Sequence, residues 1–195
     1  MKKTLSLIAV SLLFTISAYA GVVEQISQHV TSSTKMNQSV KTFVVSTLIP
    51  LMSNPIFVDG VKAQNAKDIS MEVIKRIDRE WQEAEEELPI HKELMGNAVG
   101  MEIKRFIQST PAVVEAFVMD NKGANVGQND LTSDYWQGDE AKWKNSYNNG
   151  KGGLDVGKEK FDVSANTTLQ QISLPIIDGE KVVGAICIGL NISRL

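Results

Sequence analysis

Apolar residues recur at helical spacing through the first half of the chain. Between residues 21 and 52 this stripe is weak at its start, where the chain is rich in Ser, Thr, Asn and Gln, and strong at its end. The strong part of the stripe consists of Val40, Phe43, Val44, Leu48 and Leu51. We expect this helix to end or kink at Pro50 and Pro55, because proline lacks the amide hydrogen that a helix needs. A short helix should follow over residues 54–64.

The most regular helical pattern covers residues 68–88. Its single apolar stripe consists of Ile69, Val73, Ile77, Trp81, Ala84 and Leu88. Asp68 is suited to cap the start of this helix, and Pro89 should stop it. A further helix is expected over residues 97–108, with an inward face formed by Val99, Ile103, Phe106 and Ile107.

From Pro111 onward the pattern changes to strands and turns. Residues 113–119 form an apolar run that ends in the turn sequence Asp-Asn-Lys-Gly, and residues 125–128 can pair back on it as a hairpin. Residues 169–177 and 181–192 flank an Asp-Gly turn and predict a second, longer hairpin. The second half of the chain is therefore expected to form a mainly antiparallel sheet.

Between the two hairpins, residues 139–147 are expected to form a short helix. Residues 148–157 are rich in Gly and Asn and should form a loop. Helices followed by an antiparallel sheet predict an α+β fold, and the length of the chain fits one domain of ordinary size. We assign residues 21–108 to a helical segment and residues 109–195 to the sheet portion of the same domain.

The N-terminus has the pattern of a cleavable signal peptide over residues 1–20. Lys2 and Lys3 precede an uncharged, mostly apolar run over residues 5–16, and Ala18-Tyr19-Ala20 supplies small residues at a cleavage site. The apolar run is too short to span a bilayer as a helix, although an uncleaved N-terminal anchor is the alternative. We therefore expect a secreted, soluble periplasmic protein with no membrane anchor after cleavage.

Charge and cysteine content narrow the possible partners. Without Lys2 and Lys3 the chain holds 18 basic and 23 acidic residues, a net charge of −5, which argues against nucleic-acid and anionic-membrane partners. Cys187 is the only cysteine, so it cannot form an internal disulfide. It lies in an apolar run, and we expect a buried structural residue; the alternative is a reactive thiol.

The sequence contains no complete motif for catalysis, cofactor binding or metal binding. Residues 152–158 resemble a phosphate-binding loop, but Glu159 stands where Ser or Thr must hold magnesium. A calcium loop over residues 120–130 would lack several oxygen ligands. His29 and His91 do not have metal-ligand spacing, and His91 is expected at the surface. We expect no enzyme activity, no cofactor and no metal.

The segment over residues 132–147 is the candidate for a ligand site, because aromatic and acidic residues alternate along it. A ligand pocket needs mostly apolar walls and a few placed polar groups. The expected pocket walls are Tyr135, Trp136, Trp143 and Tyr147. The expected polar contacts, which would suit a ligand amine, are Asp134, Asp139 and Asp162. Two alternatives stay open: the aromatic residues pack the short helix onto the sheet, and Asp134 or Asp139 caps that helix.

Several short pieces, taken in order, resemble a known family. They are Asn54-Pro55, a long helix ending at Trp81, Phe117-Val118-Met119-Asp120-x-x-Gly123, Thr132-Ser133-Asp134-Tyr135-Trp136-Gln137-Gly138-Asp139-Glu140, Ile172-x-x-Pro175-Ile176 and Val183-Gly184-Ala185-Ile186. Together they resemble the PAS-like extracytoplasmic sensor domains called PDC or Cache domains. The resemblance implies long N-terminal helices packed on a PAS-like antiparallel sheet as a single Cache module. It also implies one small-molecule pocket on the sheet, closed by strand-connecting segments.

In that family the ligands are typically amino acids, carboxylates or amines, so a small polar metabolite is the implied partner. The amine-binding and amino-acid-binding signature is not traceable here, since no Arg lies two residues before Trp143. Because the chain stops soon after the last predicted strand, we expect a free-standing sensor without an output domain. A membrane receptor, or a second copy paired through the N-terminal helix, would be its protein partner. The alternatives are a protein-interaction module that has lost its ligand and a secreted enzyme.

Overall fold

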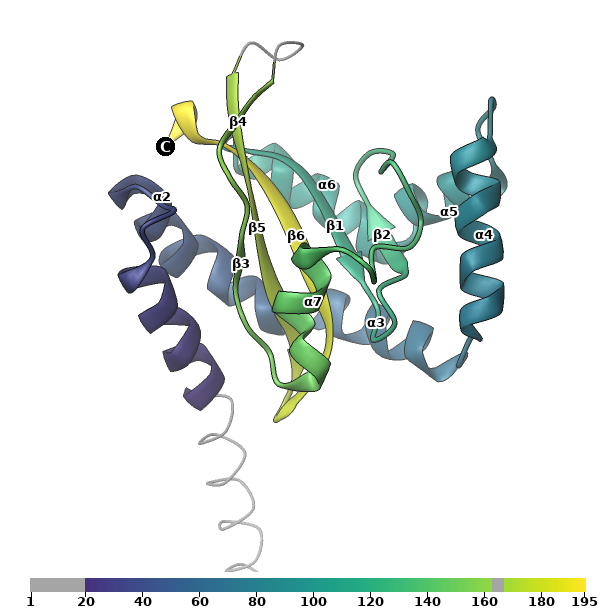
Figure 1. Cartoon of the computed structure of the whole chain (residues 1–195), viewed down its shortest axis with the longest axis horizontal. Coiled ribbons are helices and arrows are strands. Elements are labelled where there is room, and N and C mark those ends of the chain that lie inside the picture. Colours follow the sequence, from purple (N-terminus) through teal and green to yellow (C-terminus); the bar gives the residue numbers. More distant parts are fainter. Residues whose placement is uncertain (1–19, 163–166) are drawn as a thin grey trace, which may run out of the picture.

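The structure is a computed structural model that describes residues 20–162 and 167–195 (Figure 1). All but the last residue of the predicted signal peptide lies outside them. Residues 20–32 are helical, and α2 (Gln38–Phe43) leads into a π-helical turn (Val44–Leu48) and a 3₁₀ segment (Ile49–Ser53). The single helix expected over residues 21–52 is therefore interrupted at residues 33–37. Asn37 starts the second piece, because its side-chain oxygen accepts a hydrogen bond from Val40 N at 2.9 Å.

Four further helices precede the sheet: α3 (Pro55–Ala66), α4 (Met71–Glu83), α5 (Pro89–Gly96) and α6 (Ala98–Ser109). The predicted cap of α4 was wrong, because Ser70 caps it and Asp68 lies before it with a left-handed φ of 43°. This helix also ends five residues earlier than predicted. Pro89 therefore does not stop α4; instead it begins α5, because proline fits the first turn of a helix.

The second half forms one antiparallel sheet in the order β2-β1-β6-β5-β3, with β4 also pairing with β5. Its strands are β1 (Val113–Met119), β2 (Asn125–Gln128), β3 (Asp155–Val156), β4 (Lys160–Asp162), β5 (Thr167–Asp178) and β6 (Lys181–Asn191). The short helices of this half are α7 (Ala141–Tyr147), a 3₁₀ turn (Asn148–Gly150) and a C-terminal 3₁₀ turn (Ile192–Arg194). Both predicted hairpins and the predicted α+β fold with its mainly antiparallel sheet are confirmed.

The inner face of the sheet packs on the helices and forms the main core. Its largest fully buried side chains include Leu48, Met52, Phe57, Ile103, Ile172, Leu174, Ile186 and Ile188. The outer face is covered in part by α7, which lies in front of β5 and β6 in Figure 1. A separate, smaller cluster joins α4 and α5 to the chain around Tyr135 and contains Ile74, Trp81, Leu94 and Ala124.

Among the described residues, no single helix is both long and apolar enough to cross a membrane. Two consecutive helical segments, Gln38–Ser53 and Pro55–Ala66, are bent by 48° relative to each other. Together they have the length and composition of a broken membrane span. Within that pair, Leu48, Met52 and Phe57 are fully buried in the main core.

Cys187 lies on the outer face of β6 and is fully buried, as the sequence predicts. It packs with Phe117, Met119 and Ala185 beneath α7. Burial raises the pKa of its thiol to about 12. The nucleophilic thiolate is therefore negligible at neutral pH, and the alternative of a reactive thiol is not supported.

Candidate functional site

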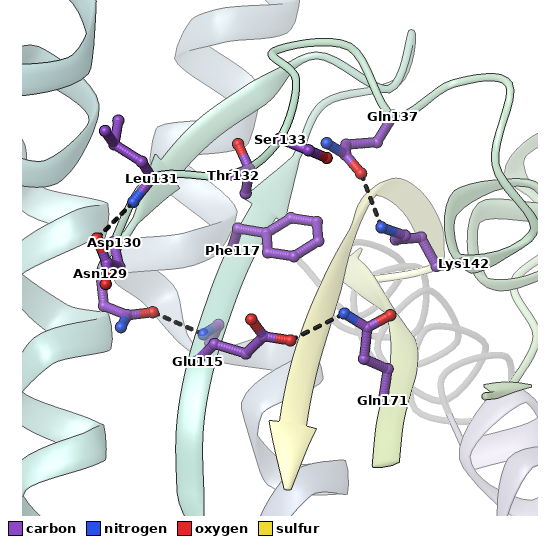
Figure 2. A pocket seen from close by; sticks show the side chains of 11 residues that line it. Glu115, Phe117, Asn129, Asp130, Leu131, Thr132, Ser133, Gln137, Lys142 and Gln171 are labelled. Carbon is purple, nitrogen blue, oxygen red and sulfur yellow. Dashed lines mark hydrogen bonds between the residues drawn. The ribbon is translucent and has the colours of Figure 1, made fainter. Parts of the chain in front are cut away.

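A cavity of about 140 Å³ lies on the outer face of the sheet, next to the part that α7 covers. Its floor is formed by Glu115 and Phe117 of β1 and by Gln171 of β5. Its walls are residues 129–133, Gln137 and Lys142, which comes from the first turn of α7 (Figure 2). Because side chains alternate along a strand, Glu115 and Phe117 share the outer face of β1. The charged carboxylate of Glu115 therefore lies beside the aromatic ring of Phe117.

The wall over residues 129–133 is held in place from α4. The indole Nε1 of Trp81 donates a hydrogen bond to the carbonyl of Thr132 at 2.9 Å. Just beyond the wall, the amide of Trp136 donates to Asp78 Oδ1 at 2.8 Å. Burial raises the pKa of Asp78, while the hydrogen bond from the Trp136 amide opposes that shift. Two hydrogen bonds to α4 thus hold the chain at and just beyond this wall.

Trp81 is itself packed against His91, whose predicted surface position is wrong. His91 is only 4% exposed, and its ring meets the Trp81 ring edge-on with centroids 4.1 Å apart. Its Nδ1 accepts a hydrogen bond from the amide of Leu88 at 3.1 Å, which stabilises the start of α5. Burial lowers the pKa of His91, and the nearby carboxylate of Glu87 opposes the shift. His91 lies two residues after a proline in a charged stretch, a context that gives no sequence signal of such burial.

Lowering the pH below about 6.5 is expected to destabilise the protein through His91. The unfolded chain binds this proton more readily than the folded one, so the contribution of neutral His91 is complete above the unfolded pKa. It is lost as the pH falls from there through the lower folded pKa. Urea unfolding between pH 5 and pH 8 measures the effect.

The control for this pH effect is His91→Gln, which removes the titrating group but keeps a side-chain acceptor for the Leu88 amide. The unfolding free energy of wild type minus that of His91→Gln should decline below pH 6.5. This difference is needed because burial also raises the pKa of Asp78 and of Asp120. Protonation of these two carboxyl groups stabilises the folded state as the pH falls, which opposes the loss through His91. A pH-independent difference, or an equal effect of His29→Gln at an exposed site, would contradict the assignment to His91.

Lys142 brings a positive charge into the cavity wall. Its side chain is 16% exposed, and its ammonium group donates to Gln137 Oε1 at 3.0 Å and pairs with Glu140 Oε2 at 3.0 Å. The same ammonium lies 5.3 Å from the centroid of the Phe117 ring. Gln137 is itself only 1% exposed, so its carbonyl oxygen depends on Lys142 for a partner.

Glu115 brings a negative charge to the floor of the same cavity. Its Oε1 accepts a hydrogen bond from Gln171 Nε2 at 2.8 Å, and within the described residues its Oε2 has no partner. Among the ion pairs of the described chain, none joins Glu115 to Lys142. The cavity thus holds two opposite charges that do not pair with each other (Figure 2). Glu115 is bonded to the neutral amide of Gln171, whereas Lys142 is bonded to Gln137 and already pairs with Glu140.

The aromatic residues of the predicted site lie around the cavity and not in its lining. Trp143 and Tyr147 stack with centroids 5.0 Å apart and pack on the sheet beneath α7, and Trp143 Nε1 donates to Asp120 O at 3.0 Å. This arrangement matches the packing alternative. Tyr135 is 2% exposed and lies within the small cluster that also contains Trp81. The ammonium of Lys75 lies 5.1 Å from the centroid of the Trp136 ring.

The acidic residues of the predicted site also lie outside the lining. Asp134 Oδ1 accepts hydrogen bonds from Ser133 Oγ and from Gln137 Nε2. Asp139 is exposed and does not cap α7, whose N-cap position is Glu140. The side chain of Asp162 lies outside the described residues. A ligand-binding role for the seven residues stays a prediction, because only their neighbours reach the cavity: Thr132, Ser133, Gln137 and Lys142.

The segment over residues 132–147 contributes Thr132, Ser133, Gln137 and Lys142 to the cavity walls, whereas the floor lies outside it. Glu115 is a charge within the apolar strand Val113–Met119, and Gln171 is a polar residue of the long strand β5. A charged residue among apolar neighbours in a strand was the available signal. In the described residues, no three His, Cys, Asp or Glu side chains come together to hold a metal ion.

No family model and no curated protein sequence matches this chain. Solved structures that match it include the sensor domain of the histidine kinase DctB from V. cholerae, at 13% identity and a TM-score of 0.44 over 91% of this chain and 56% of that one. The sensory domain of the Campylobacter jejuni chemoreceptor Tlp3 matches at 12% identity and a TM-score of 0.40, over 92% and 64% of the two chains.

The ligand-binding domain of the Pseudomonas aeruginosa chemoreceptor PctC, solved with GABA, matches at 9% identity and a TM-score of 0.41 over 71% and 58%. This chain thus spans 56–64% of the length of these three domains. All three are sensor or ligand-binding domains.

Proposed function

We propose that this protein is an extracytoplasmic sensor domain that binds a small zwitterionic metabolite, such as an amino acid, in the cavity between Glu115 and Lys142. The observation that carries the proposal is the presence of these two opposite charges in one cavity without an ion pair between them. A buried or half-buried charge is costly unless it is paired. A ligand ammonium group supplies the charged partner that Glu115 lacks, and a ligand carboxylate can bind the ammonium of Lys142 beside Glu140.

The available hydrogen-bonding capacity supports this pairing. A lysine ammonium has three donors, and Lys142 uses two of them on Gln137 and Glu140. The third is available to a ligand carboxylate. Glu115 Oε2, which has no partner among the described residues, can accept a hydrogen bond from a ligand ammonium. Hydrogen bonds between charged groups are about twice as strong as neutral ones, so the two contacts fix the orientation of the ligand.

The size of the cavity supports a small ligand. Its volume of about 140 Å³ is below the roughly 300–1,000 Å³ typical of pockets for drug-sized molecules. Phe117 offers an apolar surface between the charged groups, which suits a short aliphatic part of the ligand.

A thermal-shift and calorimetric screen of the purified protein tests the proposal. Each amino acid is paired with an acid that lacks only its amine: glycine with acetate, alanine with propionate, valine with isovalerate and GABA with butyrate. A zwitterion at about 100 times its Kd should stabilise the fold by about 2.7 kcal/mol. The matched acid should bind more weakly. A flat screen on well-folded protein would overturn the proposal and favour the protein-interaction module.

The extracytoplasmic location is supported by the signal-peptide pattern over residues 1–20. Mass spectrometry of the protein recovered from the periplasm checks it. We expect a mature chain that begins at Gly21. A protein retained in the cytoplasm with residues 1–20 intact would contradict this part of the proposal.

A further inference from the structure

We propose that Gly189 determines the specificity of the cavity for ligands that carry an ammonium group, because its lack of a side chain positions the carboxylate of Glu115. The inference rests on the proposed function for its ligand chemistry. Gly189 touches no ligand in this scheme, so it is a positioning residue that acts through Glu115.

Gly189 lies in β6, between the two strands that form the floor of the cavity. It is in register with Glu115 of β1 on one side and with Gln171 of β5 on the other. The three residues therefore form a row across three neighbouring strands. Neighbouring strands are about 4.8 Å apart, so β1 and β5 are separated by about 10 Å.

The hydrogen bond of 2.8 Å between Gln171 Nε2 and Glu115 Oε1 has to cross over β6. Figure 2 shows this bond running across the strand that separates the two residues. A Cβ atom at Gly189 would lie 2.3 Å from Glu115 Cγ and 2.6 Å from Glu115 Oε1. The side chain of Glu115 therefore occupies the space that any other residue at position 189 would fill.

The contacts at Gly189 differ from those at the other glycine within β6. A Cβ at Gly184 would lie 2.3 Å from the backbone oxygen of Met119, which cannot easily move. At Gly189 all three near atoms belong to the outer part of the Glu115 side chain, which can swing away. We therefore expect Gly189→Ala to fold with Glu115 displaced from the floor, so that the carboxylate loses Gln171 and its place for the ligand ammonium.

The first test compares Gly189→Ala with wild type in calorimetric titrations of the four amino acids and their matched acids. For the amino acid that wild type binds most tightly, the Kd should rise at least about tenfold. The Kd of its amine-free partner should stay within about twofold, since Lys142 is untouched. In a Glu115→Ala background, Gly189→Ala should change neither Kd. Equal weakening of both ligands, or an undiminished effect in that background, overturns the inference.

The matched control is Gly96→Ala, because a Cβ at Gly96 meets no atom within 4 Å. It should leave both Kd values unchanged. A second readout needs no ligand: the side-chain amide of Gln171 in ¹H–¹⁵N NMR spectra should shift alike in Gly189→Ala and Glu115→Ala. If the Gln171 amide signal does not shift in Gly189→Ala, the positioning role of Gly189 is overturned, whether or not wild type binds any of the eight probes. If wild type binds none of the eight probes, that result by itself contradicts only the proposed function.

Discussion

Replacing Lys142 by methionine is expected to weaken zwitterion binding by about ten- to one-hundred-fold, the value of a charge-assisted hydrogen bond. Methionine keeps an apolar stem beside Phe117 but cannot donate a hydrogen bond to a ligand carboxylate. The change also leaves the buried Gln137 Oε1 without its partner, so a lower unfolding temperature is expected as well. Isothermal titration calorimetry of the folded variant measures the loss of affinity.

Lys151→Met is the matched control, because Lys151 is exposed and does not line the cavity. It should bind the zwitterion as wild type does. If Lys142→Met binds the amino acid with unchanged affinity, the ligand carboxylate does not lie at Lys142. In that case the cavity between Glu115 and Lys142 is not the site.

Trp81→Ala should produce the largest loss of stability outside the main core, about 3–5 kcal/mol for truncating a buried aromatic residue. Trp81 is 5% exposed, and its ring contacts both His91 and Tyr135. Its loss also frees the carbonyl of Thr132, so the cavity wall should loosen and zwitterion affinity should fall. Urea unfolding at neutral pH gives the free energy, and calorimetry gives the affinity.

Trp81→Phe separates the two contributions of this side chain. It retains most of the ring packing but leaves Thr132 O without the indole donor. It should therefore lower the free energy of unfolding by about 1–3 kcal/mol and still weaken ligand binding. If Trp81→Ala costs less than about 1 kcal/mol, the cluster around Tyr135 does not hold α4 in place.

Much of the fold could be predicted because its signals are local. The turn Asp-Gly at residues 178–179 and the apolar runs on both sides specify the hairpin of β5 and β6 without reference to the rest of the chain. The break at residues 33–37 was missed because a polar stretch looks alike in an exposed helix and in a loop. The early end of α4 was missed because Glu85, Glu86 and Glu87 are good helix formers that leave no stop signal before Pro89.

The site was less predictable because it depends on contacts between distant residues. Glu115 and Gln171 are 56 positions apart and meet only when β1, β6 and β5 align in register. Apart from Lys142, the walls come from a loop, in which no periodicity indicates which side chains face inward. The aromatic residues were predicted as pocket walls because they are large, but large rings such as that of Trp143 also pack a short helix onto a sheet.

The attachment of α4 has a consequence for how the protein opens. This helix packs through the small cluster around Tyr135 rather than through the main core. Small clusters open more often than large ones, in cooperative units that need not unfold the rest. Since α4 and the cavity wall share the bond from Trp81 to Thr132, a ligand that holds the wall also suppresses this partial opening. Slowed amide hydrogen exchange in α4, a helix that contributes no lining residue, would then report that the cavity is occupied.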